Sequence, residues 1–145
     1  MEEEQFFPFI GVEDDYIYQS NKDLPLFEEF AYDFEINDFI FDEKGEIKIL
    51  QGVEALKIWI KKALLTDRFV HEIYSWDYGT ELITLVGQKF SQGLTESEAF
   101  RYITEALLIN PYIENVTNNG VKFDGDNLTI NIIVETIYGE VNISV

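Results

Sequence analysis

The sequence predicts an α+β fold in which an N-terminal β-hairpin and about three helices pack on a C-terminal antiparallel sheet. Three patterns indicate this class. Apolar residues alternate on both sides of a turn at Gly45, apolar residues recur at helical spacing over residues 53–65, and apolar and polar residues alternate over residues 128–132. A chain of 145 residues suits one domain, and 46% hydrophobic residues is typical of a globular protein.

The hairpin is expected over residues 34–50, with Asp42-Glu43-Lys44-Gly45-Glu46 as its turn. Phe34 and Ile36 are expected to open its first strand. Gly52 ends the second strand, and a helix follows over residues 53–65. One face of this helix is apolar and the other is basic, carrying Val53, Leu56, Trp59, Ile60, Ala63 and Leu64 on the first and Lys57, Lys61 and Lys62 on the second.

Two further helices are expected. A short one covers residues 80–86 and ends at Gly87, which suits the position after a helix. Thr95-Glu96-Ser97-Glu98 has the pattern of a capping box, so a longer helix is expected to begin there. It should end at Asn110, because Pro111 disfavours helical geometry in the residue before it. Strands are then expected over residues 113–123, 128–137 and 141–145, with a turn over 124–127.

Negative charge is concentrated near the N-terminus. The formal net charge is −18, and residues 1–46 carry 15 acidic side chains against Lys22 and Lys44. Residues 1–30 combine acid clusters, prolines and short apolar runs. We assign them to an acidic N-terminal arm that lies either along a neighbouring protein or along its own domain. The charge disfavours nucleic acid and anionic membranes as partners, and an acidic surface suits solubility, a basic protein partner or mimicry of nucleic acid.

The residue types also exclude several chemistries. With no cysteine and one histidine, His71, the chain cannot build a disulfide framework, a nucleophilic triad or a multi-histidine metal site. The acids near Gly125 lack the spacing of an EF-hand loop and are assigned to a turn. Asp77 lies between Trp76 and Tyr78, but one carboxylate does not make the pair that a glycosidase needs. We expect no catalytic residue, no cofactor and no metal.

The connection after residue 65 is aromatic where connections are normally polar and small. It carries Phe69, Ile73, Tyr74, Trp76 and Tyr78, and such side chains must pack beneath the domain or be presented to a partner. We expect Ile73, Trp76 and Tyr78 to be at least partly buried. The glycine that follows at position 79 is expected to adopt a conformation that disfavours a Cβ.

This connection also carries a family resemblance. Arg68 shortly after a helix, followed by Tyr-Ser-Trp-Asp-Tyr-Gly-x-Glu-Leu over residues 74–82, resembles the XkdS-like baseplate proteins of defective prophages. Those proteins are relatives of the T-even phage wedge protein that initiates the contractile sheath. The likeness covers residues 31–145, which we treat as one sheath-initiator-like baseplate wedge domain. Where the wider family has Glu-Pro-Arg-Ile, this chain has Asn110-Pro111-Tyr112-Ile113, so the charge pair of the family is absent.

The resemblance implies a structural, non-enzymatic role as a baseplate wedge component that helps initiate sheath assembly. The implied partners are the tail sheath subunit, other wedge proteins and tail tube or hub proteins, with assembly in the host cytoplasm and a final place in the baseplate. An acidic binding protein is the alternative, and a peptidoglycan hydrolase is the third hypothesis. The interface candidates are Arg68, Tyr74, Trp76, Asp77, Tyr78, Gly79, Pro111, Tyr112 and Ile143.

Arg68 is either an architectural residue near a helix C-terminus, where an ion pair to Asp77 or Glu81 is also compatible, or a direct partner contact. Ile143 represents the last strand, in which Glu140 is the only charge. We expect the edge of that sheet to pair with a strand of a partner, because an unprotected edge of this composition is otherwise an aggregation hazard.

Overall fold

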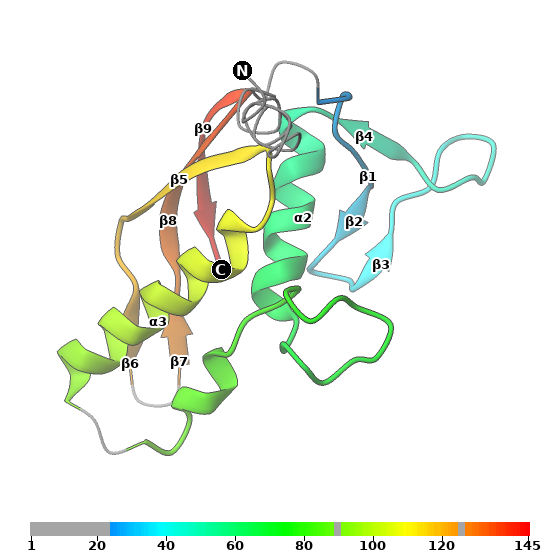
Figure 1. The fold of residues 1–145 in the computed structure, drawn as a ribbon. Helices are drawn as coiled ribbons and strands as arrows, with labels where there is room; N and C mark the ends of the chain where they lie inside the picture. Colours follow the sequence, from blue (N-terminus) through cyan, green and yellow to red (C-terminus); the bar gives the residue numbers. More distant parts are fainter. Residues whose placement is uncertain (1–23, 89–90, 125–126) are drawn as a thin grey trace, which may run out of the picture.

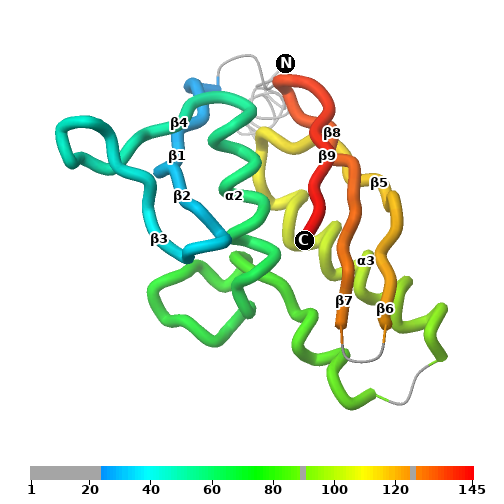
Figure 2. Tube along the Cα trace, turned by 180° about the vertical axis from the view of Figure 1, so that it is seen from behind, coloured from blue at the N-terminus to red at the C-terminus, as the bar shows by residue number. Residues whose placement is uncertain are grey.

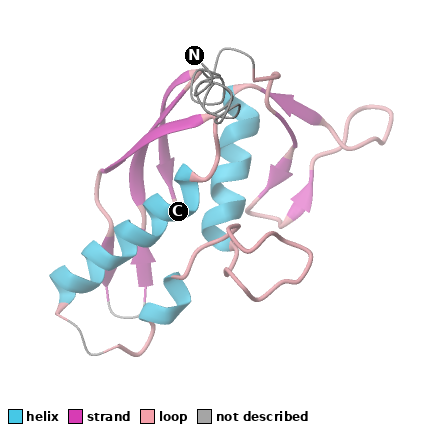
Figure 3. Cartoon of the chain, viewed as in Figure 1, coloured by secondary structure: helices cyan, strands magenta, loops and turns pink. Residues whose placement is uncertain are grey.

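The computed structural model describes residues 24–88, 91–124 and 127–145, and it confirms an α+β fold (Figure 1). The described residues contain two α-helices, one 3-10 helix and nine short strands (Figure 3). The largest sheet is antiparallel, with strand order β5-β8-β9. Its strands are β5 (Ile113–Asn118), β8 (Asn131–Thr136) and β9 (Gly139–Ser144).

Both helices pack on one face of this sheet, and their apolar stripes meet its inner side chains. Helix α3 (Gln92–Leu108) contacts β5, whereas α2 (Val53–Leu65) contacts β9 and α3 (Figures 1 and 2). Burying one such aliphatic side chain contributes roughly 1.5–3 kcal/mol, so this layer supplies most of the apolar stabilisation. The largest fully buried apolar side chains are Leu56, Ile60, Ile103, Leu107, Ile132 and Val134.

The opposite face of the sheet is polar, as the alternation in the sequence predicts. Val116, Val134 and Val141 lie side by side in register and are buried. Their neighbours Thr117 and Asn142 lie on the other face and are exposed. A strand with one buried and one wet face therefore accounts for the pattern of this region.

The N-terminal strands form two small ladders beside α2. The expected turn is confirmed, since the Asp42 N–H donates to the Glu46 carbonyl (2.8 Å) and Gly45 has φ +83°. Around this turn only Phe41 and Ile47 bridge directly. The remaining pairing joins β1 (Glu28–Phe30) to β4 (Ile49–Gln51) and β2 (Tyr32–Asp33) to β3 (Asp38–Phe39).

The expected start of the hairpin is wrong. Phe34 and Ile36 lie in the turn between β2 and β3, not in a strand. The Asp33 carboxylate accepts the N–H groups of Glu35 (2.8 Å) and Ile36 (3.4 Å), and Asn37 has φ +54°. An Asp side chain that bonds the backbone two residues ahead makes a turn, and here it overrides the apolar alternation.

Two expectations about helices also need correction. The third helix is not an α-helix but a 3-10 turn, η3 (Leu82–Leu85), which suits so short a segment. The capping box is not used, because α3 begins one turn earlier. The Ser91 side chain is its N-cap and accepts the Leu94 N–H (3.4 Å), whereas the Thr95 hydroxyl donates back to the Ser91 carbonyl (3.1 Å).

The expected strand over residues 113–123 is interrupted near Gly120, which has φ +125°. The Asn118 side chain accepts the N–H groups of Gly120 (2.8 Å) and Val121 (3.0 Å) and turns the chain there. A separate hairpin follows, and its strands are β6 (Lys122–Asp124) and β7 (Asn127–Thr129).

The segment before β1 is tied to the C-terminal half of the domain. The Tyr112 hydroxyl donates to the Pro25 carbonyl (2.6 Å), and the Phe27 N–H donates to the Tyr138 hydroxyl (3.0 Å). Glu29 forms an ion pair with Lys62 on α2 (3.1 Å). These contacts fix residues 25–29, the last part of the stretch that the sequence assigned to the arm. The rest of the arm, residues 1–23, lies outside the described residues.

Candidate functional site

The aromatic connection is a closed loop between α2 and η3. At its base the Arg68 N–H donates to the Thr80 carbonyl, and the Thr80 N–H donates to the Thr66 carbonyl, both at 2.9 Å. Asp67 and Thr80 form a parallel bridge, and the Thr80 side chain is buried. A loop whose ends meet in this way, and whose side chains pack on one another, is an Ω-loop. We call residues 66–80 the aromatic loop.

Gly79 closes this loop, and its expected conformation is confirmed. It has φ +97°, and a Cβ built on it would lie 2.6 Å from the Thr66 carbonyl oxygen. The backbone of residues 66–68 therefore passes too close for any side chain at position 79. Only glycine satisfies both the left-handed conformation and the close approach.

The burial expected for the aromatic residues is only partly correct. Tyr78 is half-buried and packs edge-on against Trp59 of α2 at 6.0 Å between ring centroids. The other two expectations are wrong, since Ile73 is 86% exposed and Trp76 is 78% exposed. The rings of the loop pack mainly on one another instead, as Phe69 on Trp76 (5.6 Å) and Tyr74 on Tyr78 (4.7 Å) show. The loop is closed at its base, and the side chains at its tip remain exposed to solvent.

Phe69 is held in an uncommon conformation. It has φ +68°, which a bulky side chain rarely adopts and which costs about 1–3 kcal/mol. Its ring lies 5.8 Å from the Arg68 guanidinium carbon. Strain of this kind persists where surrounding contacts fix it, and it is common at binding sites.

Arg68 itself takes part in the closure of the loop through its backbone. The ion pair to Asp77 or Glu81 that the sequence allowed is not formed, since no carboxylate of these two lies within 4.0 Å of the guanidinium. The Arg68 Nε is buried and has no hydrogen-bond partner among the described residues. The cation contacts an aromatic face, so the geometry supports the architectural role.

A groove of about 370 Å³ lies between the aromatic loop, the C-terminal end of α2 and the turn between β2 and β3. The Lys62 ammonium is held there by Glu29 and lies 5.7 Å from the Tyr32 ring and 5.8 Å from the Phe39 ring. Burial raises the pKa of Tyr78 at the same place, against a hydrogen bond with Thr66 that lowers it. We call this the aromatic groove, and it is lined by Tyr32, Phe34, Asn37, Phe39, Lys62, Leu65, Thr66, Tyr74 and Tyr78.

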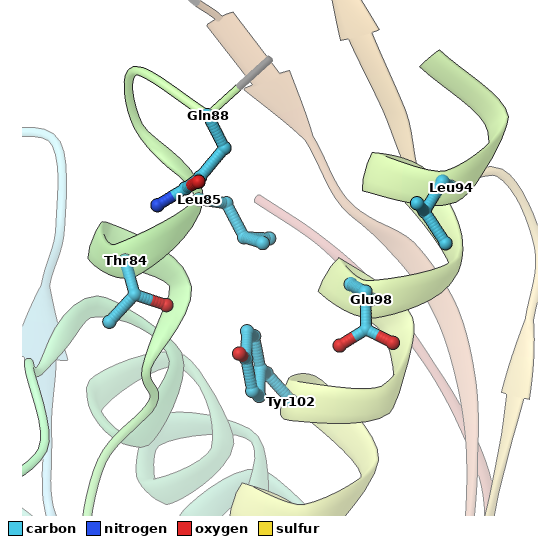
Figure 4. A pocket seen from close by; sticks show the side chains of 6 residues that line it. All are labelled: Thr84, Leu85, Gln88, Leu94, Glu98 and Tyr102. Carbon is cyan, nitrogen blue, oxygen red and sulfur yellow. The ribbon is translucent and has the colours of Figure 1, made fainter. Parts of the chain in front are cut away.

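A second pocket lies between η3 and α3 (Figure 4). Its one carboxylate, Glu98, accepts two hydrogen bonds from Arg101. The hydrogen bond from Arg101 lowers the pKa of Glu98, the direction opposite to that of a general acid. Across the three described segments, no group of three histidine or carboxylate side chains is placed to hold a metal ion. This pocket is lined by Thr84, Leu85, Gln88, Leu94, Glu98 and Tyr102.

The candidates directly after α3, Pro111 and Tyr112, differ in exposure. Pro111 is exposed. The Tyr112 side chain is only 8% exposed, and its hydroxyl bonds the Pro25 carbonyl, so it fastens the N-terminal segment to the domain. Asn110 is buried, and its side chain accepts the Tyr112 N–H (3.0 Å), a turn that sequence reasoning missed. The packing of Tyr112 gives its side chain a structural role.

The last candidate, Ile143, has a side chain that is 3% exposed and lies in the core. Ile130 and Val145 exchange both backbone hydrogen bonds (2.8 and 2.9 Å), and such pairs recur at every second residue of an antiparallel ladder. The backbone groups of Ile143 therefore point to β8. Those of Asn142 and Ser144 point to the outer edge of β9, which pairs with no described strand.

The two edges of this sheet differ in protection. Strand β5 has a register irregularity between Ile113 and Asn115 and carries Glu114 there. Strand β9 pairs in continuous register from Gly139 to Ser144, with neither a bulge nor a proline. Each strand carries one glutamate, Glu140 in β9, so the irregularity is what distinguishes the two edges. Bulges are a usual means of blocking strand addition, so β9 is the more receptive edge.

Comparison with known proteins defines the class. A family model described as contractile injection system sheath initiator matches residues 28–139, and the chain belongs to this family. The match begins at the first residue of β1 and ends at the first residue of β9. Sheath initiators are structural parts of contractile injection systems, which agrees with the structural role that the sequence predicted.

One relative narrows this class. The chain is similar to the phage-like element PBSX protein XkdS of Bacillus subtilis strain 168, with 32% identity over 104 residues, which cover 70% of this chain and 74% of that protein. The resemblance drawn from the aromatic loop is therefore confirmed. None of the described helices is long and apolar enough to cross a membrane.

Proposed function

We propose that this protein is a baseplate wedge component of a contractile tail and that it helps initiate the sheath by offering the outer edge of β9 to a strand of the sheath subunit. Family membership supports a sheath-initiating role. The observation that carries the mechanism is the continuous β9 edge, whose backbone groups at Asn142 and Ser144 face away from β8. Main-chain hydrogen bonds to such an edge supply affinity with little dependence on side chains.

The proposal requires no catalysis, no cofactor and no metal. Its other partners are wedge proteins and tail tube or hub proteins, and its final location is the baseplate of a particle that assembles in the host cytoplasm. The formal charge of −18 keeps free copies apart until a partner covers the edge.

The test uses proline at two neighbouring positions of β9. Asn142→Pro removes an N–H that faces the outer edge, a position where a sheet tolerates proline. Ile143→Pro removes an N–H that bonds β8 and is expected to unfold the sheet. Each variant, with Asn142→Ala as control, is supplied to a host that lacks the gene, and sheath on tail tubes is scored by electron microscopy.

Asn142→Pro is expected to fold, with an unchanged thermal midpoint within a few degrees, and to abolish sheath assembly, while Asn142→Ala supports normal sheaths. Full-length sheaths with Asn142→Pro would show that the β9 edge is not the template. Loss of sheaths with both Asn142 variants would assign the effect to the side chain instead.

A further inference from the structure

We propose that the aromatic groove and the tip of the aromatic loop form a second docking surface, which takes a protein segment carrying apolar side chains flanked by lysine or arginine. This goes beyond the proposed function, because it assigns a different partner surface from the β9 edge.

The groove and the tip are continuous. Tyr74 and Tyr78 line the groove and pack on each other with tilted rings, and Phe69 and Trp76 lie on the same loop and pack together. Leu65, at the end of α2, lines the groove and is exposed. Exposed Trp and Tyr side chains gathered in one place are the composition of interaction hot spots.

The backbone that carries this surface is fixed by contacts within the chain. The two backbone hydrogen bonds to Thr80 and the fit of Gly79 against Thr66 hold the base of the loop. Phe69 stays at positive φ, where relaxation would relieve strain if the loop were free to move. A loop fixed before binding loses little conformational entropy on binding, so its exposed rings can contribute most of their contact energy.

Charge determines what kind of segment fits. Asp33, Glu35 and Asp38 lie in and beside the turn that borders the groove, and Glu72 and Asp77 lie on the loop. None of these five carboxylates forms an ion pair with another described residue. Lys61 and Arg68 are the cations at this surface that form no ion pair with another described residue, and Lys62 is paired with Glu29. Five carboxylates against these two cations leave a negative field, which attracts lysine and arginine.

The rings of the groove also accept cations. The Lys62 ammonium lies within 6 Å of the Tyr32 and Phe39 rings, and the Lys61 ammonium lies 5.6 Å from the Phe34 ring. Ammonium and guanidinium groups of a partner would meet further ring faces of the same kind at Tyr74 and Tyr78. An anionic lipid surface would be repelled by the carboxylates, so a basic protein segment is the occupant that the charges favour.

The position of the surface allows two partners at once. Helix α2 lies between the N-terminal strands on one side and the β5-β8-β9 sheet on the other (Figures 1 and 2). The groove is on the side of the N-terminal strands. A partner in the groove and a partner strand on β9 would therefore bind on different sides of the helix, and the chain would join them.

The first test measures the accessibility of Trp76 in the full-length protein without substitutions. Hydroxyl-radical oxidation followed by mass spectrometry assigns modification to single side chains, so tryptophans of other tail proteins do not interfere. Trp76 should be oxidised readily in the free protein, since it is exposed. In tail particles assembled with the protein supplied to a host that lacks the gene, its oxidation should fall severalfold. Equal oxidation in the free protein and in particles would overturn the proposal.

The second test measures incorporation into the same particles by quantitative immunoblot. Trp76→Ala should lower incorporation by roughly tenfold or more without changing the thermal midpoint, since the side chain is exposed. Ile83→Ala removes an exposed apolar side chain outside the surface and should incorporate normally. Normal incorporation of Trp76→Ala would contradict the proposal.

Charge and partner class are tested separately. Asp77→Lys should weaken incorporation, and Glu114→Lys, the same charge change on an exposed residue of β5, should not. Equal losses would show that charge at this surface does not select the partner.

Vesicles of phosphatidylcholine with and without phosphatidylglycerol serve as the lipid probe. Binding to them that depends on Trp76 would assign the surface to a membrane. Asn142→Pro, which lacks the β9 edge contact, should keep Trp76 protected, so failure of one proposal is distinguishable from failure of the other.

Discussion

The two β regions on either side of α2 use similar residues in opposite ways. On the C-terminal side, Ile132 and Val134 of β8 lie under two helices and are almost completely buried. On the N-terminal side, Phe30 of β1 and Ile49 of β4 form a cross-strand pair with both side chains exposed. The ladders there are two or three residues long, and helix α2 packs on β1 and β4. Phe30, Phe39 and Ile49 of these strands are exposed.

This difference shows that apolar content alone does not locate the core. The three-stranded sheet and its helices stabilise the domain. The N-terminal strands and the aromatic loop hold Phe, Tyr and Trp side chains on a surface, and exposed apolar patches of this kind indicate binding partners. One half of the described chain therefore buries its apolar side chains, and the other half presents many of them to solvent.

The largest expected effect contrasts the two regions directly. Ile132→Ala leaves a cavity in the core and should lower the free energy of unfolding by about 2–5 kcal/mol. Ile49→Ala removes an exposed side chain, and its effect should stay within about 0.5 kcal/mol. Urea denaturation of both variants measures the difference. Comparable losses would mean that the N-terminal ladders belong to the core.

A second, smaller effect concerns closure of the aromatic loop. Gly79→Ala must relieve a contact of 2.6 Å with the Thr66 carbonyl as well as a positive φ, and it should destabilise by about 2–3 kcal/mol. Gly87 also has positive φ but has no neighbour within 4 Å of a built Cβ, so Gly87→Ala should lose only about 1–2 kcal/mol. If the two variants melt at the same temperature, the close approach at Gly79 is not a constraint.

The smallest effect is a pH dependence at the anchor of the loop. Burial raises the pKa of Tyr78, so the folded state holds this proton more tightly than the unfolded state does. The stabilisation is complete below about pH 10, the ordinary value for Tyr, and is lost as the pH rises through the folded pKa. Tyr78→Phe should flatten the fall in thermal midpoint above pH 10, and Tyr102→Phe should not. Identical profiles for wild type and Tyr78→Phe would contradict this.

Local patterns in the sequence were sufficient for several elements. The bounds of α2 follow from apolar spacing after Gly52, and the turn at Gly45 and the hairpin at Asp124 follow from their turn residues. The family resemblance came from residues 68–82, and it holds. Each of these signals depends on neighbours within a few positions, so no knowledge of distant contacts was needed.

Competing local signals were not resolved by the sequence. Ser91 and Thr95 are both good N-cap residues, and the start of α3 one turn early became clear only from the bond that Ser91 accepts. Phe34 and Ile36 continue the alternation of a strand, yet the Asp33 carboxylate accepts the N–H groups of Glu35 and Ile36 and makes a turn there. In both places two favourable local arrangements exist, and packing of the whole chain selects one.

By itself, then, the sequence determined the fold class, the helix α2, the strand character of the C-terminal region and the need for glycine at position 79, since these depend on periodicity and on backbone conformation. It did not determine where those strands break, because the strands expected over 113–123 and 128–137 are each divided in two. Only the tertiary structure decided that β1 pairs with β4, that Ile143 turns its N–H to β8, and that Trp76 faces solvent. The physical reason is the same in each instance. Strand pairing and burial depend on which distant segments come together, and an apolar side chain looks alike in sequence whether it is covered or presented.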